Sequence, residues 1–246
     1  MSDLAKRLRD LHSADRPLVL PNVWDARTAQ VFAATGFPAL ATPSSGIAES
    51  LGHTDQQGAP VEEMFAAAAR IAGAVDVPVT VDAEAGYGLP AKEFAARLLD
   101  TGAVGCNLED SALPASGLVP VDEQVRWLSD VRQAAPELVI NARVDVYLHG
   151  GTTDDAVKRS IAYLDAGADC VYPILAPGEA AIAELVERVP GPVNVLFTPD
   201  GPSLPRLAEL GVARVTFGGG LYHAMIDAVR GMAERIAAGA SPYGDE

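Results

Sequence analysis

The sequence predicts an α/β fold, a (β/α)₈ TIM barrel in which the whole chain, residues 1–246, forms one domain. Eight short runs rich in Val, Ile and Leu alternate with amphipathic stretches, as expected for parallel strands that helices cover. The length of 246 residues suits a single barrel of this kind. A doubly wound open sheet is the alternative, but the chain lacks the glycine fingerprint of dinucleotide-binding sheets.

The predicted strands are continuous in apolarity rather than alternating, which is typical of strands buried on both faces. They span residues 18–22, 39–42, 77–82, 104–109, 138–143, 170–174, 193–197 and 214–217. Amphipathic stretches between them predict helices over residues 61–74, 92–100, 122–134, 154–165 and 179–189.

A glycine recurs where a helical stretch gives way to a strand. Gly36, Gly102, Gly167 and Gly211 each come one to three residues before a predicted strand. Glycine at the end of a helix adopts the left-handed conformation without a Cβ clash. The repeat therefore indicates successive β/α units, and eight such units give a barrel.

The composition excludes several classes of partner. The net charge of −15, from 33 acidic and 18 basic residues, argues against binding to nucleic acid or to an anionic membrane. Cys106 and Cys170 lie in apolar runs and are expected to be buried free thiols. The charged N-terminus is unlike a signal peptide, and no apolar run is long enough to span a membrane. We expect a cytoplasmic protein.

Polar residues follow the apolar bodies of the first five strands. The ends carry Asn22, Thr42, Asp82, Glu109 and Arg143. In a (β/α)₈ barrel the active site forms at the C-terminal ends of the strands. A barrel with a purely structural role has no need of such a pattern, so these ends predict a catalytic site.

Three acidic residues on neighbouring strands predict a metal site. Asp82 and Glu84 are two residues apart on an extended strand end, which places both side chains on one face, and Glu109 can reach the same point. Three converging carboxylates repel one another unless a cation binds them. Oxygen ligands favour Mg²⁺, with Mn²⁺ as an alternative. A structural role as helix caps or ion-pair partners is the competing interpretation.

Arg143 and the loop after the second strand are candidate anion-binding groups. An arginine grips a carboxylate or phosphonate through two parallel hydrogen bonds. Pairing of Arg143 with Glu109 or Asp145 is the structural alternative. Ser44, Ser45 and Gly46 offer hydroxyl and backbone N–H groups, although many βα loops share that feature.

The sequence resembles the isocitrate lyase / phosphoenolpyruvate mutase superfamily over residues 15–230. The matching stretches are PNVWDARTAQVFAATGFPALATPSSGIAESLGHTD, VPVTVDAEAGYG, GAVGCNLEDS, INARVDVYL and AGADCVYP. The match is best to the shorter-looped members described as phosphoenolpyruvate phosphonomutase-like proteins. The resemblance implies a TIM barrel whose final helix often swaps between subunits, and therefore a homodimer or homotetramer.

The resemblance also implies roles for particular residues. Mg²⁺ would be bound directly by Asp82, with Glu84, Glu109 and Asp55 acting directly or through water. Substrates would be small 2-oxo or 2-hydroxy carboxylates or phosphonates, whose C–C or P–C bond is cleaved or formed through a metal-stabilised enolate. The expected catalytic residues are Arg143, Asp55 and Tyr87. The expected substrate-binding residues are Trp24, Asp25, Ser44, Ser45, Gly46, Arg143 and Asn194.

The loop after the fourth strand departs from the family pattern. Lyases that act on isocitrate or methylisocitrate carry a K-[KR]-C-G-H loop there, whereas this chain reads SALPASGLVPVDEQ. Ser111 stands where the mutases and phosphonate hydrolases carry a lysine. The residues that are present favour a lyase or decarboxylase acting on an oxaloacetate-like substrate, with hydrolytic C–C cleavage of a similar diacid as a variant of that reaction.

Three further hypotheses stay open. One is carboxyphosphonoenolpyruvate or phosphoenolpyruvate phosphonomutase activity. Another is a homologue that binds a metal and a carboxylate without turnover. The third is a phosphosugar isomerase or flavin enzyme, because Gly218, Gly219 and Gly220 resemble a phosphate cradle before a helix. The ends of the sixth and seventh strands offer no second phosphate contact.

Overall fold

The computed structural model describes residues 3–14, 16–113 and 116–243. All eight predicted strands are confirmed, each ending within a few residues of the prediction. They are β1 (Leu18–Leu20), β2 (Leu40–Ala41), β3 (Val79–Asp82), β4 (Gly105–Glu109), β5 (Val139–Val144), β6 (Cys170–Pro173), β7 (Asn194–Leu196) and β8 (Arg214–Thr216).

The strands pair in parallel in two sheets. One sheet has the order β2-β3-β4-β5-β6 and the other the order β1-β8-β7. Single parallel bridges, Asn22 with Ala41 and Val171 with Val193, lie at the two junctions. The fold is therefore α/β with a curled parallel sheet, but the described residues do not form a continuous ladder of eight strands.

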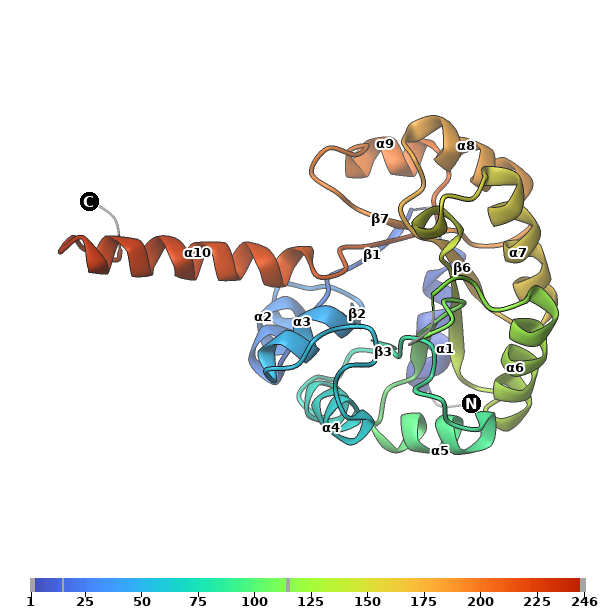
Figure 1. Cartoon of the computed structure of the whole chain (residues 1–246), viewed down its shortest axis with the longest axis horizontal. Helices are drawn as coiled ribbons and strands as arrows, with labels where there is room; N and C mark the ends of the chain where they lie inside the picture. Colours follow the sequence, from blue (N-terminus) through green and yellow to red (C-terminus); the bar gives the residue numbers. More distant parts are fainter. Residues whose placement is uncertain (1–2, 15, 114–115, 244–246) are drawn as a thin grey trace.

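After α1, which precedes the first strand, the helices follow the strands along the chain and lie outside the sheets (Figure 1). They are α1 (Asp3–Leu11), α2 (Ala26–Ala34), α3 (Ser44–Ser50), α4 (Val61–Ala72), α5 (Ala91–Asp100), α6 (Val121–Ala134), α7 (Thr153–Asp165), α8 (Glu179–Arg188), α9 (Leu204–Glu209) and α10 (Gly220–Ala237), with a short 3₁₀ helix η1 (Val146–His149). The five predicted helices correspond to α4, α5, α6, α7 and α8. Gly36, Gly102, Gly167 and Gly211 all have positive φ, as predicted.

The helix α10 differs from the others because it points away from the body of the molecule (Figure 1). Of its side chains, Tyr222 is buried. The apolar side chains of Val229, Met232 and Ile236 are 50%, 41% and 60% exposed. The helix therefore leaves an apolar surface without a partner within the chain described.

The hydrophobic core packs around the bodies of the strands, and the C-terminal ends of the strands lie at the surface of the molecule. Cys106, Leu108, Ile140 and Ala142 are fully buried between the central strands and the helices. Cys106 and Cys170 are buried free thiols, as predicted. At the opposite end of the strands, α1 packs its apolar residues against β1, β2 and β5. In the part of the chain that the structure describes, no helix is long and apolar enough to cross a membrane.

Candidate active site

Two neighbouring cavities open at the C-terminal ends of the strands. The first has a volume of about 330 Å³ and the second about 430 Å³, and Ser44, Asp55 and Arg143 line both. Every strand contributes to the first cavity, either from its own residues or from a residue no more than three positions after its end. The contributing residues are Asn22, Ser44, Asp82, Asn107, Arg143, Tyr172, Leu196 and Thr216. Convergence of eight strand ends is the arrangement predicted for a catalytic site.

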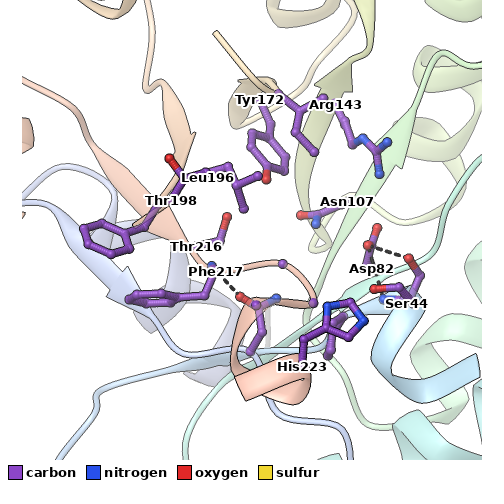
Figure 2. Close-up of a pocket in the computed structure, with 18 of the residues that line it drawn as sticks. Ser44, Asp82, Asn107, Arg143, Tyr172, Leu196, Thr198, Thr216, Phe217 and His223 are labelled. Carbon is purple, nitrogen blue, oxygen red and sulfur yellow. Dashed lines mark hydrogen bonds between the residues drawn. The ribbon is translucent and has the colours of Figure 1, made fainter. Parts of the chain in front are cut away.

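The first cavity has a polar side and an apolar side (Figure 2). Ser44, Asp82 and Arg143 lie on one side, and Leu196 and Phe217 face them from β7 and the end of β8. The rings of Phe197 and Phe217 pack together with centroids 5.4 Å apart. The cavity therefore suits a small molecule with a charged end and a hydrocarbon portion.

Asp82 is the last residue of β3 and lies beside Asn107 of β4 in the parallel register. Its Oδ2 atom accepts hydrogen bonds from the Ser44 hydroxyl at 2.9 Å and the Ser44 backbone N–H at 3.3 Å. Its Oδ1 atom is buried and has no hydrogen-bond partner among the described residues. Burial raises the pKa of Asp82, although Arg143 and Ser44 oppose the shift.

Asp55 carries a second carboxylate oxygen of the same kind. It lies in the loop between α3 and α4 and lines both cavities. Its Oδ1 atom is also buried without a partner in the described part of the chain. A buried carboxylate oxygen without a hydrogen bond is costly and calls for a ligand or an ordered water.

Glu84 and Glu109 are buried, and each has a protein partner. Glu84 accepts a short hydrogen bond from the Gln57 backbone N–H, and burial raises its pKa to about 7. Glu109 pairs with Arg143 at 2.7 Å. Burial still raises the pKa of Glu109, and Arg143 opposes the shift.

Arg143 lies between two carboxylates, so both structural alternatives predicted for it are present. Its Nη1 atom contacts Glu109, and its Nε and Nη2 atoms donate to Asp145 at 2.6 and 3.1 Å. A guanidinium has five N–H groups, so two of them stay available on the side chain. The ion pairs fix the orientation of Arg143 toward both cavities.

The predicted trio of metal ligands does not form a compact cluster. Within residues 3–14, 16–113 and 116–243, no group of three or more His, Cys, Asp and Glu side chains is close enough to hold an ion by itself. The physical reason is that Arg143 binds Glu109 and that Gln57 binds Glu84. The unpartnered oxygens of Asp82 and Asp55 nevertheless fit a hard cation that completes its coordination with water or substrate.

The structure places Trp24 and Asp25 outside both cavities, on a separate cavity beside α2, and their role in substrate binding stays a prediction. The Trp24 ring packs edge-on against Tyr222, with centroids 5.4 Å apart. Asp25 is the N-cap of α2, and its side chain accepts a hydrogen bond from the Thr28 N–H at 2.7 Å. These contacts stabilise the start of α2 and its packing against α10.

Gly46, Asn194 and Tyr87 are likewise absent from the lining of the two cavities. Gly46 packs so closely that a Cβ atom would lie 3.0 Å from both Pro43 and Tyr222. Asn194 is fully buried and exchanges hydrogen bonds with Thr216. Tyr87 packs its ring edge-on against Phe65.

The described lining of the cavities includes several residues that the sequence reasoning missed. In the first cavity these are Asn107, Tyr172 and Thr216. The sequence did contain a signal for these three residues. A polar residue within an otherwise apolar strand of a barrel is expected to point into the barrel. In the second cavity they are Ser111 and His149. His149 is exposed at the rim of this cavity, and its place follows from the turn of η1 after β5.

Comparison with known proteins identifies the family. The phosphoenolpyruvate phosphomutase family matches residues 8–237. The 2-methylisocitrate lyase of Bacillus subtilis (strain 168) is 32% identical over 208 residues, which cover 81% of this chain and 69% of that protein.

Solved structures agree with the family match. One is the crystal structure of a Burkholderia cenocepacia J2315 protein that is 37% identical in sequence. The match covers 95% of this chain and 100% of that chain, with a TM-score of 0.89. A phosphonopyruvate hydrolase in complex with oxalate and Mg²⁺ has the same fold, at 22% identity, 97% and 89% coverage and a TM-score of 0.88. The chain therefore belongs to the phosphoenolpyruvate phosphomutase family, within the isocitrate lyase / phosphoenolpyruvate mutase superfamily of lyases and mutases.

Proposed function

We propose that the chain is a Mg²⁺-dependent lyase that breaks a C–C bond in a small 2-oxo carboxylate, with oxaloacetate as the simplest substrate. In this proposal the two sheets act as one (β/α)₈ barrel, and the chain is one domain. The observation that carries the proposal is the pair of unpartnered Oδ1 atoms of Asp82 and Asp55, which line the same cavity as Arg143.

Asp82 and Asp55 would hold the cation, with Glu84 in support. A bound Mg²⁺ would supply a Lewis acid that withdraws charge from a substrate oxygen. Ser44 keeps the Asp82 carboxylate in one orientation through two hydrogen bonds. The second carboxylate oxygen therefore stays directed away from Ser44 and available to a ligand.

Arg143 would bind the substrate carboxylate. Its two free N–H groups lie on a side chain already fixed by Glu109 and Asp145, so little side-chain entropy is lost when the substrate binds. Ser45 lines the first cavity and adds a hydroxyl group. The apolar side chains of Leu196 and Phe217 exclude water from the opposite side.

Phosphonomutase activity is the second candidate, because the family match is to phosphoenolpyruvate phosphomutase. Its weakness is the segment after Asp110, where Ser111 provides a hydroxyl group and no positive charge for a transferring phosphoryl group. A binder without turnover is the third possibility. The products formed distinguish these functions from the lyase.

We also propose that α10 docks on a second copy of the chain in a homodimer or homotetramer. The helix projects from the body (Figure 1) and exposes Val229, Met232 and Ile236. An apolar stripe on a projecting helix is stabilised when a neighbouring surface covers it.

The test is release of pyruvate from oxaloacetate in wild type and Asp82→Asn. Asparagine preserves the size of the side chain and removes the charge. We expect Mg²⁺-dependent release by the wild type above the rate without enzyme, and a loss of at least about 100-fold in the variant. Mg²⁺ should raise the Tm of the wild type and not that of the variant.

Asp76→Asn is the matched control, because Asp76 is an exposed acid just before β3, at the end of the strand opposite to Asp82. It should behave as wild type. Product analysis by NMR separates pyruvate from the oxalate and acetate of a hydrolysis, and a parallel reaction with phosphoenolpyruvate detects phosphonopyruvate formed by a mutase. Equal Mg²⁺-dependent pyruvate release by Asp82→Asn and wild type would contradict the proposal.

A further inference from the structure

Decarboxylation of oxaloacetate needs a proton donor. Cleavage of the bond between C3 and C4 releases CO₂ and leaves the electron pair on C3, where one added proton gives pyruvate. A side chain that exchanges protons near neutral pH accelerates such a transfer. The segment after Asp110 contains no Cys, His or Lys as far as Gln124, so a donor of one of these types has to come from another segment.

Ser111 and His149 meet at the second cavity. Ser111 follows β4, and His149 ends η1 after β5. The Ser111 Oγ atom lies 3.4 Å from the His149 Nε2 atom and 2.5 Å from the Asp145 Oδ2 atom. His149 and Ser111 line the second cavity together with Glu109 and Arg143.

The hydrogen bonds orient the imidazole. The Ser111 hydroxyl donates to Asp145, so its oxygen is left to accept the Nε2–H group of His149. The Nδ1 atom is then free to take up and release a proton. Asp145 contacts the serine and not the imidazole, so the three residues are not arranged to activate Ser111 as a nucleophile.

The other acids of the second cavity have protein partners or another proposed role. Asp55 is assigned to the proposed cation, and Asp145 accepts hydrogen bonds from Arg143 and Ser111. Glu109 is bound to Arg143, and Glu84 accepts the Gln57 N–H. Tyr87 lines neither cavity. His149 is exposed, so it can be reprotonated from bulk water after each turnover.

Charged groups surround His149 from two directions. Asp145 and Glu109 lie toward the strands, on the side of the second cavity. Asp155, Lys158 and Arg159 of α7 line a third, smaller cavity that His149 also borders. The imidazole therefore connects the reaction cavity with an exposed, charged surface.

We propose that His149 is a catalytic residue that protonates C3 of the substrate, and that Ser111 is its positioning residue. This rests on the proposed lyase function. The step consumes the imidazolium proton, forms the C3–H bond and leaves a neutral imidazole, which solvent reprotonates. His149 thereby takes the place of an acid/base group in the loop after Asp110.

The test compares kcat, KM and pH profiles for pyruvate release by wild type, His149→Gln, His149→Ala and Ser111→Ala. General acid catalysis contributes about 100-fold or more. We expect His149→Gln to lower kcat by about that factor, with KM within about 3-fold and Mg²⁺ still raising Tm. The alkaline limb of the wild-type kcat profile should be absent in this variant, and added imidazole should restore activity to His149→Ala.

Ser111→Ala should lower kcat and keep an alkaline limb, because the imidazole loses its anchor but is still present. His53→Gln is the matched control, since His53 pairs with Glu63 and lines neither cavity. If His149→Gln keeps wild-type kcat and the alkaline limb while Asp82→Asn is inactive, the proton-donor role is refuted and the lyase function stands. If the wild type releases no pyruvate above the enzyme-free rate, both proposals fail.

Discussion

Acidification should weaken the fold through His12, a histidine next to α1. His12 is 6% exposed. Its Nδ1 atom lies 2.8 Å from the Leu8 carbonyl oxygen, and its Nε2 atom has no partner among the described residues. Burial, together with the positive charge of Arg214, lowers the pKa of His12 from 6.5 to about 4. The folded protein thus keeps this imidazole neutral.

The size of the effect follows from the two pKa values. The unfolded chain takes up the proton near pH 6.5, and the folded chain does so only near pH 4. Above pH 6.5, His12 is neutral in both states and does not lower the free energy of unfolding. As the pH falls from 6.5 toward 4, the unfolded chain binds a proton that the folded chain does not, and the free energy of unfolding decreases. A shift of this size corresponds to about 3 kcal/mol in total, of which about 2 kcal/mol is lost between pH 7.5 and pH 5.

The assay is urea unfolding of wild type and His12→Gln at pH 7.5 and pH 5. Other groups titrate in the same range, so the quantity of interest is the difference between the two proteins. We expect the free energy of unfolding of the wild type to fall by about 2 kcal/mol more than that of the variant. His53→Gln is the control and should follow the wild type.

An equal loss in wild type and His12→Gln would refute the reasoning. It would mean that water or a rearrangement stabilises protonated His12 in the folded state. The predicted loss lies on the acid side of neutrality.

Two further predictions concern residues outside the cavities. Asp25→Ala should lower the free energy of unfolding by about 1 kcal/mol, measured by urea denaturation, because it removes the N-cap of α2; kcat/KM should stay at the wild-type value, and a large loss of kcat/KM would restore Asp25 to the substrate site. Val229→Asp with Ile236→Asp should reduce the molar mass in solution to that of the monomer, measured by light scattering, because α10 would lose its apolar contacts; an unchanged oligomer would exclude α10 from the interface.

The strands were predictable because burial on both faces leaves a continuous apolar run in the sequence. The helix ends were predictable at Gly36, Gly102, Gly167 and Gly211, because the positive φ there is easily adopted only by glycine. The strand junctions were not predictable. Short strands such as β2 and β7 pair through only a few residues, and hydrogen-bond geometry at each junction depends on the twist of the whole sheet.

The site was predictable only in part. Asp82 and Arg143 were found because strand ends converge in a parallel barrel. The capping role of Asp25 was not predicted, because a capping aspartate and a ligand-binding aspartate look alike in a sequence. His149 was missed because its distance from Ser111 depends on the turn of η1, which no local pattern encodes.

The division of charge in the site is compatible with the proposal that one cavity edge holds a cation and an anion together. Arg143 binds Glu109 and Asp145 and so neutralises part of the acidic group. Asp82 and Asp55 lack such a partner for their buried Oδ1 atoms. A cation is therefore favoured near the unpartnered oxygens, while the free N–H groups of Arg143 favour a carboxylate.

Arg143 also links the two cavities, because it lines both. Through Asp145 it reaches Ser111, and through Ser111 it reaches His149. A substrate carboxylate bound to Arg143 would thus lie between the proposed cation site and the proposed proton donor. Residues that follow different strands would then bind the substrate and protonate it. A substitution of His149 would therefore alter turnover without altering the affinity for Mg²⁺.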